Sequence, residues 1–142
     1  MYYVNREQIE RRLNVLPELE QVFAAASSAK DNPLLFRYAE ERALHLAIEI
    51  VTDVGSYLID GFIMRDASSY EDIIDIMRDE KVIGQHLFEL LTELVRLRKP
   101  LVQEYFEWDR SAGQALARKL PPAMEEFAGN VRAYLDKENI PS

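Results

Sequence analysis

Cysteine is absent from this 142-residue sequence, and histidine occurs only twice, at His45 and His86. The lack of cysteine excludes disulfides, thiol catalysis and zinc–thiolate sites. The acidic segment EDIIDIMRDE has no histidine at metal-ligand spacing near it, and no glycine-rich phosphate loop occurs. We therefore expect neither a metal site nor a cofactor.

Long apolar runs are also missing. No stretch approaches the roughly 20 apolar residues of a membrane span, and the start, MYYVNREQIERR, lacks the apolar core of a signal peptide. A cytoplasmic protein without membrane contact is expected. Basic residues number 17 against 25 acidic ones, which gives a net charge of −8. This charge disfavours broad nucleic-acid binding, so any such contact needs a local basic focus, for which RLRK at 96–99 is the best candidate.

Glycine is scarce, with five residues, and no linker or internal repeat interrupts the chain. Residues 1–142 are therefore expected to form a single domain. Apolar residues recur at three- and four-residue steps throughout, and no alternating strand pattern of useful length competes. The pattern predicts an all-α fold, and short connections favour an up-and-down antiparallel bundle.

Several residues predict where helices begin and end. Pro17 is expected to kink or divide the first helix. A long helix is expected from Pro33 to Gly61, with proline in its first turn. Ser68 and Glu71 fit a capping box at the start of the next helix. LPP at 120–122 is expected to separate the last helix from the one before it.

The segment VRLRKPLVQEY, residues 95–105, places charge inside an apolar seam. At about 100° per residue, one arc of a straight helix would carry Leu87, Leu91, Leu94, Arg98, Leu101 and Tyr105. Pro100 predicts a kink or restart of the helix beside Arg98. Arg98 then either faces a polar cleft that binds phosphate or pairs with a carboxylate of a neighbouring helix.

Residues 98–105, RKPLVQEY, resemble the R-N-x-L-V-H-x-Y motif of HepT-like proteins, which carry a HEPN domain. Arg98, Leu101, Val102 and Tyr105 match the motif. The segments ERALHLAIEIVTDVGSYLI (41–59) and SSYEDIIDIMRDEKVI (68–83) resemble the second and third helices of the family. The likeness extends over nearly the whole chain.

The resemblance implies a five-helix bundle that forms a homodimer, with the motifs of two protomers meeting in a cleft. It also implies a metal-independent ribonuclease toxin and a minimal nucleotidyltransferase as the antitoxin partner. That partner would transfer AMP to the motif tyrosine, here Tyr105. Two positions depart from the motif, since Lys99 replaces asparagine and Gln103 replaces histidine.

Gln103 stands where the family has the base that takes a proton from the ribose 2′-hydroxyl. Histidine titrates near neutral pH, whereas a carboxamide does not. The first hypothesis is therefore a weak or inactive ribonuclease that keeps RNA, nucleotide or partner binding through Arg98, Lys99, Gln103 and Tyr105. The second is an active ribonuclease with another base, and the third is a helical interaction module without nucleotide chemistry.

The two histidines are each expected to pack or to face solvent. Either could replace the missing base only if the fold brought it beside Arg98, which one sequence does not reveal.

Overall fold

The computed structural model describes residues 3–142, and every regular element in that range is an α-helix. The elements are α1 (Arg6–Leu13), α2 (Leu16–Ser28), α3 (Pro33–Gly61), α4 (Tyr70–Asp79), α5 (Gln85–Arg96), α6 (Arg98–Val102), α7 (Arg110–Ala117) and α8 (Leu120–Lys137). The all-α prediction is confirmed. Eight segments replace the five implied by the resemblance, because the first, fourth and fifth expected helices are each divided in two.

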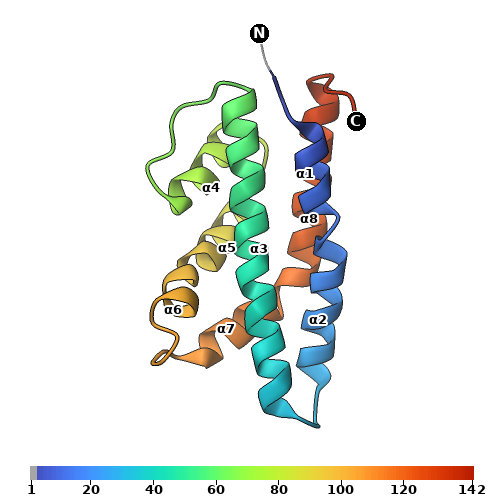
Figure 1. Ribbon diagram of the computed structural model, residues 1–142. Coiled ribbons are helices and arrows are strands. Elements are labelled where there is room, and N and C mark those ends of the chain that lie inside the picture. The colour runs from blue at the N-terminus through green and yellow to red at the C-terminus, as the bar shows by residue number, and fades with distance from the viewer. Residues whose placement is uncertain (1–2) are drawn as a thin grey trace.

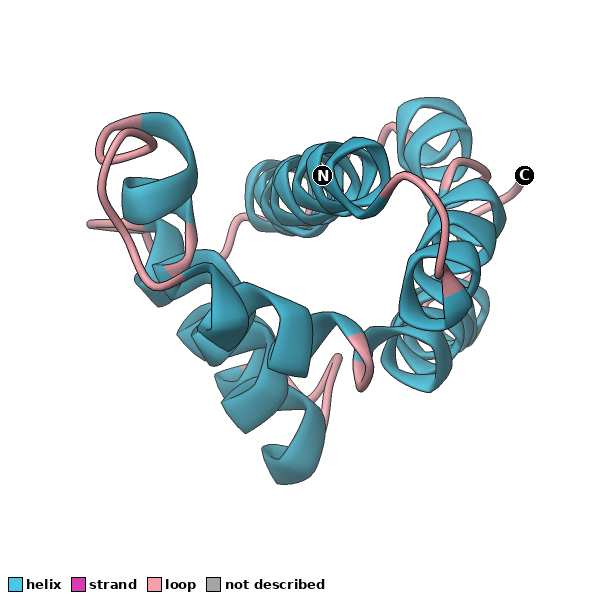
Figure 2. Cartoon of the chain, turned by 90° about the horizontal axis from the view of Figure 1, so that it is seen from below, coloured by secondary structure: helices cyan, strands magenta, loops and turns pink. Residues whose placement is uncertain are grey.

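The long helix α3 runs the length of the molecule between two groups of helices (Figure 1). On one side, α1 and α2 continue one another as a broken column, and α8 packs beside them. On the other side lie α4, α5 and α6, while α7 crosses toward α8 (Figures 1 and 2). The largest fully buried side chains come from both groups and from α3: Phe23, Phe127, Ile9, Leu13, Leu16, Leu44, Ile48, Leu58, Ile74, Ile76, Met77 and Leu87.

The predicted helix boundaries hold at three of the prolines. Pro17 lies in the first turn of α2, just after the break between α1 and α2. Pro33 opens α3, which ends at Gly61 as expected. Pro121 lies in the first turn of α8. Proline is tolerated in a first turn because the amides there have no partner within the helix.

The predicted capping box at the start of α4 is wrong by one residue. The cap is Ser69, whose hydroxyl accepts a hydrogen bond from the Asp72 amide at 3.0 Å. The Asp72 carboxylate in turn accepts from the Ser68 amide at 2.9 Å. Hydrogen bonds from Arg65, and then from Ser68, lower the pKa of Asp72 to about 2. Asp72 thus takes the role expected of Glu71.

Helices α3 and α4 approach closely at Gly55. A Cβ atom at this position would lie 2.3 Å from Cγ2 of Ile73, a distance that carbon atoms do not tolerate. Any side chain at position 55 would therefore push α4 away from α3. The close contact keeps α4 in place, and with it Tyr70, the first residue of α4.

A clamp joins the start of α1 to the end of the chain. The buried side chain of Arg6 donates to the carboxylate of Asp136 at 2.8 Å and to the backbone carbonyl of Ile140 at 2.6 Å. Both bonds come from one terminal nitrogen and offset part of the cost of burying the guanidinium. The buried Nε makes no hydrogen bond and lies 3.8 Å from a carboxylate oxygen of Glu10.

Among residues 3–142, no helix combines the length and the apolar character that crossing a membrane requires.

Candidate functional site

The break between α5 and α6 lies at Leu97, not at Pro100. Leu97 ends α5 and also precedes α6, and its carbonyl accepts from the Leu101 amide at 2.9 Å. Pro100 is instead accommodated in the first turn of α6. The expected interruption beside Arg98 is confirmed. Its position before the proline agrees with the missing amide of Pro100, which leaves the Arg96 carbonyl without its helical partner.

Helix α6 ends at Val102, so Tyr105 does not share a straight helical face with Arg98. The amides of Gln103 and Glu104 both donate to the Lys99 carbonyl, at 2.8 and 3.1 Å, and close the last turn. Beyond it the chain turns away, and the Tyr105 side chain is 67% exposed. The expectation that Tyr105 lies two turns along the same face was therefore wrong.

Arg98 is half-buried between two other helices. Its guanidinium lies 4.4 Å from the ring centroid of Tyr70, the first residue of α4. Its Nε lies 3.7 Å from Oε1 of Glu49 on α3, and this buried nitrogen makes no hydrogen bond. The pair with a neighbouring acid is therefore present but long, and 29% of the Arg98 side chain stays exposed. Of the two alternatives for Arg98, the structure places a neighbouring acid beside it, at a distance longer than a hydrogen bond.

The same oxygen of Glu49 also faces His45. Nε2 of His45 lies 3.6 Å from Glu49 Oε1, one helical turn away on α3. On its other side, Nδ1 of His45 lies 3.4 Å from a terminal nitrogen of Arg42. The structure thus brings one of the two histidines beside Arg98, with the Glu49 carboxylate between them. We refer to Arg98, Glu49, His45 and Tyr70 as the Arg98 cluster.

A hollow of about 260 Å³ adjoins this cluster, and we name it the α3–α6 hollow. It is lined by Tyr38, Glu41, Arg42, His45, Leu101, Tyr105, Trp108 and Arg110. Arg110 donates to both oxygens of Glu41, at 2.6 and 2.7 Å, and these bonds raise the pKa of Arg110. Arg110 is therefore held by a carboxylate. His45 and Tyr105 share this hollow although they are far apart in the sequence.

Lys99, the second residue of α6, and Gln103, which follows its last residue, are both exposed. The ammonium nitrogen of Lys99 is 3.9 Å from a carboxylate oxygen of Glu104, an exposed pair that contributes little. Both residues follow Arg98 closely along the chain, whereas His45 reaches the site from α3. Sequence reasoning assigned His45 to packing or to the surface. The one-turn spacing of His45 and Glu49 on α3 is the signal from which the pair could have been found.

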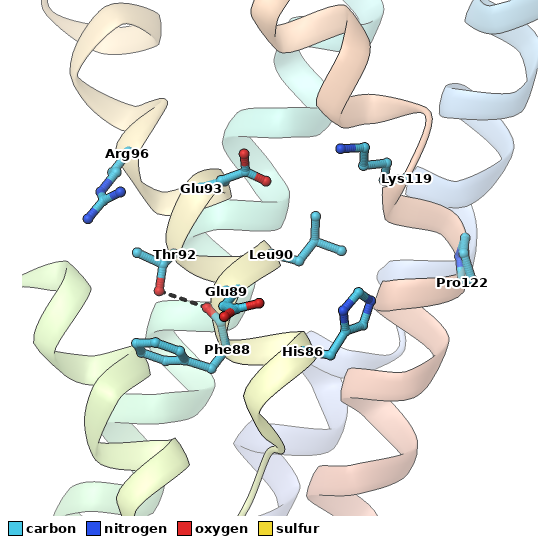
Figure 3. A pocket seen from close by; sticks show the side chains of 9 residues that line it. All are labelled: His86, Phe88, Glu89, Leu90, Thr92, Glu93, Arg96, Lys119 and Pro122. Atoms are coloured by element: carbon cyan, nitrogen blue, oxygen red, sulfur yellow. Dashed lines mark hydrogen bonds between the residues drawn. The ribbon is translucent and has the colours of Figure 1, made fainter.

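The second histidine lines a different hollow. A groove of about 850 Å³ runs between α5 and the start of α8, and it contains His86, Phe88, Thr92 and Lys119 (Figure 3). The Thr92 hydroxyl in this groove donates to the Phe88 carbonyl at 2.7 Å, so its hydrogen is used within the helix. Arg98 is not among the residues that line the groove. Within residues 3–142, no group of three or more acidic or histidine side chains is placed to hold a metal ion.

The fold agrees with comparisons to known proteins. The sequence profile of the family described as "Ribonuclease HepT-like" matches residues 11–131. This chain belongs to the HepT-like ribonuclease family.

One relative, YutE from Bacillus subtilis, matches along nearly the whole chain both in sequence and in structure. The protein named "Putative RNase YutE" is 36% identical over 138 residues, which are 97% of this chain and 94% of that protein. A solved structure of YutE, described as a cytosolic protein of unknown function, has a TM-score of 0.87 and 38% identity. It aligns with 100% of this chain and 98% of that one.

Two toxin–antitoxin structures share the fold at low identity. One is a toxin–antitoxin crystal structure with AMP-PNP, at TM-score 0.79 and 14% identity, covering 88% of this chain and 97% of that one. The other is a tri-AMPylated HEPN toxin from Shewanella oneidensis in complex with MNT antitoxin, at TM-score 0.78 and 16% identity. It covers 88% of this chain and 96% of that one. The helical bundle therefore has the same fold as these two proteins.

Proposed function

We propose that this chain is a HepT-like homodimer that binds single-stranded RNA at the Arg98 cluster and in which Gln103 does not act as a catalytic base. The observation that carries the proposal is the placement of Arg98. Its guanidinium is fixed by the Tyr70 ring and by Glu49, yet its side chain is 29% exposed. A guanidinium held in this way is a suitable partner for a phosphate oxygen.

The surroundings of Arg98 support a single-stranded ligand. Tyr105 is 67% and Phe106 77% exposed, and their rings stand edge to face with centroids 5.7 Å apart. Exposed aromatic rings stack on unpaired bases and do so with little sequence preference. The net charge of −8 opposes non-specific contact elsewhere, so binding is focused on this basic segment.

The carboxamide of Gln103 restricts what the site does with bound RNA. Cleavage without a metal requires a base to take the proton of the ribose 2′-hydroxyl. An amide side chain donates and accepts hydrogen bonds but does not take up that proton. Removal of a general base costs about 10²–10⁴-fold in rate. Gln103 therefore supports binding at the exposed end of α6, and any cleavage depends on another group.

A homodimer is part of the proposal because apolar side chains remain exposed around the site. Leu34, Leu35 and Tyr38 at the start of α3 are each more than half exposed, as are Tyr105 and Phe106. Contact with a second copy would bury such a surface around a two-fold axis. This agrees with the meeting of two motifs that the family resemblance implies.

The proposal is tested by RNA binding and sedimentation on the same samples. Arg98→Ala is expected to weaken binding of a single-stranded oligonucleotide by roughly 10- to 100-fold, as loss of a charged hydrogen bond predicts. The slope of log affinity against log salt should fall by about 0.7 for each lost phosphate contact. The wild-type protein should sediment as a dimer at micromolar concentration.

Arg11→Ala is the matched control, because Arg11 is an exposed arginine of α1 and the change in charge is the same. It should bind RNA as the wild-type protein does. Equal affinity of Arg98→Ala and wild type would contradict the proposed site. A monomer that binds no RNA would instead favour the helical interaction module.

Tyr105 is a second candidate feature, as the acceptor of AMP from a minimal nucleotidyltransferase antitoxin. Its exposure and its place in the hollow beside Arg42 and His45 favour it. AMP on Tyr105 would add negative charge and bulk near Arg98 and exclude RNA. Incubation with ATP, magnesium and a nucleotidyltransferase encoded next to this gene should add one AMP mass to the peptide containing Tyr105. An equal gain of mass in Tyr105→Phe would refute the assignment.

A further inference from the structure

We infer that His45 supplies the general base for RNA cleavage that Gln103 does not supply. This inference rests on the proposed binding of RNA at Arg98, and it concerns the chemistry that follows binding. It assigns a catalytic function to α3, which lies outside the motif segment.

The first argument is proximity to Arg98. Oxygen Oε1 of Glu49 lies 3.6 Å from Nε2 of His45 and 3.7 Å from Nε of Arg98. The imidazole and the guanidinium thus both lie within 4 Å of one carboxylate oxygen. A phosphate bound to Arg98 would bring the adjoining ribose within reach of the imidazole.

The second argument is the protonation state that the neighbours impose. A guanidinium donates hydrogen bonds and accepts none. The 3.4 Å contact from Arg42 therefore requires that Nδ1 of His45 accepts. In the neutral ring the hydrogen is then on Nε2, facing the Glu49 carboxylate. The Glu49 oxygen lies 3.6 Å from Nε2, longer than a hydrogen bond, so a small shift of either side chain would bring the carboxylate into position to orient the ring. An imidazole oriented in this way, with the lone pair on its other nitrogen, is the arrangement of a working base.

The third argument is access. The His45 side chain is 31% exposed and lines the α3–α6 hollow together with Tyr105. The contact with Arg42 is long, and Arg42 is exposed. A phosphate oxygen would compete for that guanidinium and leave Nδ1 available to the ribose.

The reaction uses no co-reactant beyond water. Nδ1 of His45 takes the proton of the 2′-hydroxyl, and the 2′ oxygen forms a bond to the adjacent phosphorus. The bond from phosphorus to the 5′ oxygen breaks, and that oxygen takes a proton from water while the imidazolium returns its own proton to solvent. The products are a 2′,3′-cyclic phosphate and a 5′-hydroxyl. Arg98 would balance the charge that gathers on the phosphoryl oxygens.

The test compares His45→Ala and His45→Gln with wild type, as full chains, in single-turnover cleavage of a single-stranded RNA oligonucleotide with EDTA present. Both substitutions should lower the cleavage rate by about 10²–10⁴-fold, while RNA affinity should change far less than it does in Arg98→Ala. His86→Ala, in the separate groove, is the matched control and should cleave normally. Added imidazole should restore part of the rate in His45→Ala.

The pH profile separates a base from a structural role. The wild-type rate should fall on the acid side as the base becomes protonated, and this limb should vanish in His45→Ala. The groups around His45 that shape this limb are Arg42 and Glu49 on α3, Arg98 on α6, Tyr105 and the Glu41–Arg110 pair.

Two outcomes would overturn the inference. Wild-type protein that binds RNA without cleaving it would remove the assigned base and leave the proposed binding function standing. Cleavage by His45→Ala at the wild-type rate would likewise show that His45 is not the base and would leave the proposed RNA binding standing. Failure of wild type to bind RNA would refute both proposals together.

Discussion

Placing histidine at position 103 is expected to restore cleavage to a protein that lacks His45. In the double variant His45→Ala/Gln103→His, the rate should rise about 10²–10⁴-fold above that of His45→Ala alone, because a base returns to the site. The side chain at position 103 is exposed, so the new ring displaces no core residue. The backbone bond from residue 103 to the Lys99 carbonyl does not involve the side chain and should persist.

The measurement is again single-turnover cleavage, with His45→Ala/Gln103→Asn as the control that changes the side chain without adding a base. The product should end in a 2′,3′-cyclic phosphate, as for wild type. A double variant that binds RNA normally but stays inactive would mean that position 103 does not reach the ribose.

Leu94→Ala should lower the free energy of unfolding by about 2–5 kcal/mol, as removal of a fully buried leucine side chain predicts. Leu94 is 0% exposed, whereas Leu101 is only partly buried against the core. The seam pattern predicted burial of both leucines, and for Leu101 this was wrong because α6 starts afresh after Leu97. Leu101→Ala should therefore cost less than Leu94→Ala.

Urea unfolding of the three variants Leu94→Ala, Leu101→Ala and Arg98→Ala gives the comparison. Arg98→Ala should cost much less than Leu94→Ala, because the contact with Glu49 is 3.7 Å long and both side chains are partly exposed. A loss for Arg98→Ala as large as that for Leu94→Ala would identify a structural ion pair and contradict a binding role.

Helical periodicity predicted many of the buried residues but not the exact residues at which helices begin and end. Met124, Phe127 and Val131 are all buried as their spacing indicated. The first residue of a helix was harder to predict, because adjacent residues can each cap the helix. Ser68 and Ser69 both offer a capping hydroxyl. In the fold Ser69 accepts from the Asp72 amide, and Arg65, seven residues before Asp72, donates to the Asp72 carboxylate. No local pattern carries that information.

The sequence predicted the part of the site that comes from the single segment 95–105. Arg98 was identified from the charge it places in an apolar seam and from the motif it begins. The His45–Glu49 pair was within reach, since the two residues are one turn apart on a helix. The closeness of this pair to Arg98 could not be predicted from the sequence, because it depends on how α6 packs against α3.

The Arg6 clamp also has a kinetic consequence. Arg6 is separated from Asp136 by 130 positions in the chain and from Ile140 by 134. Forming these two hydrogen bonds therefore closes a loop of nearly the full chain length. Closing so long a loop is entropically unfavourable until most of the intervening helices have been ordered. We therefore expect the clamp to form after the rate-limiting step of folding. The strength of the clamp would then affect the unfolding rate of the protein and have little effect on its folding rate.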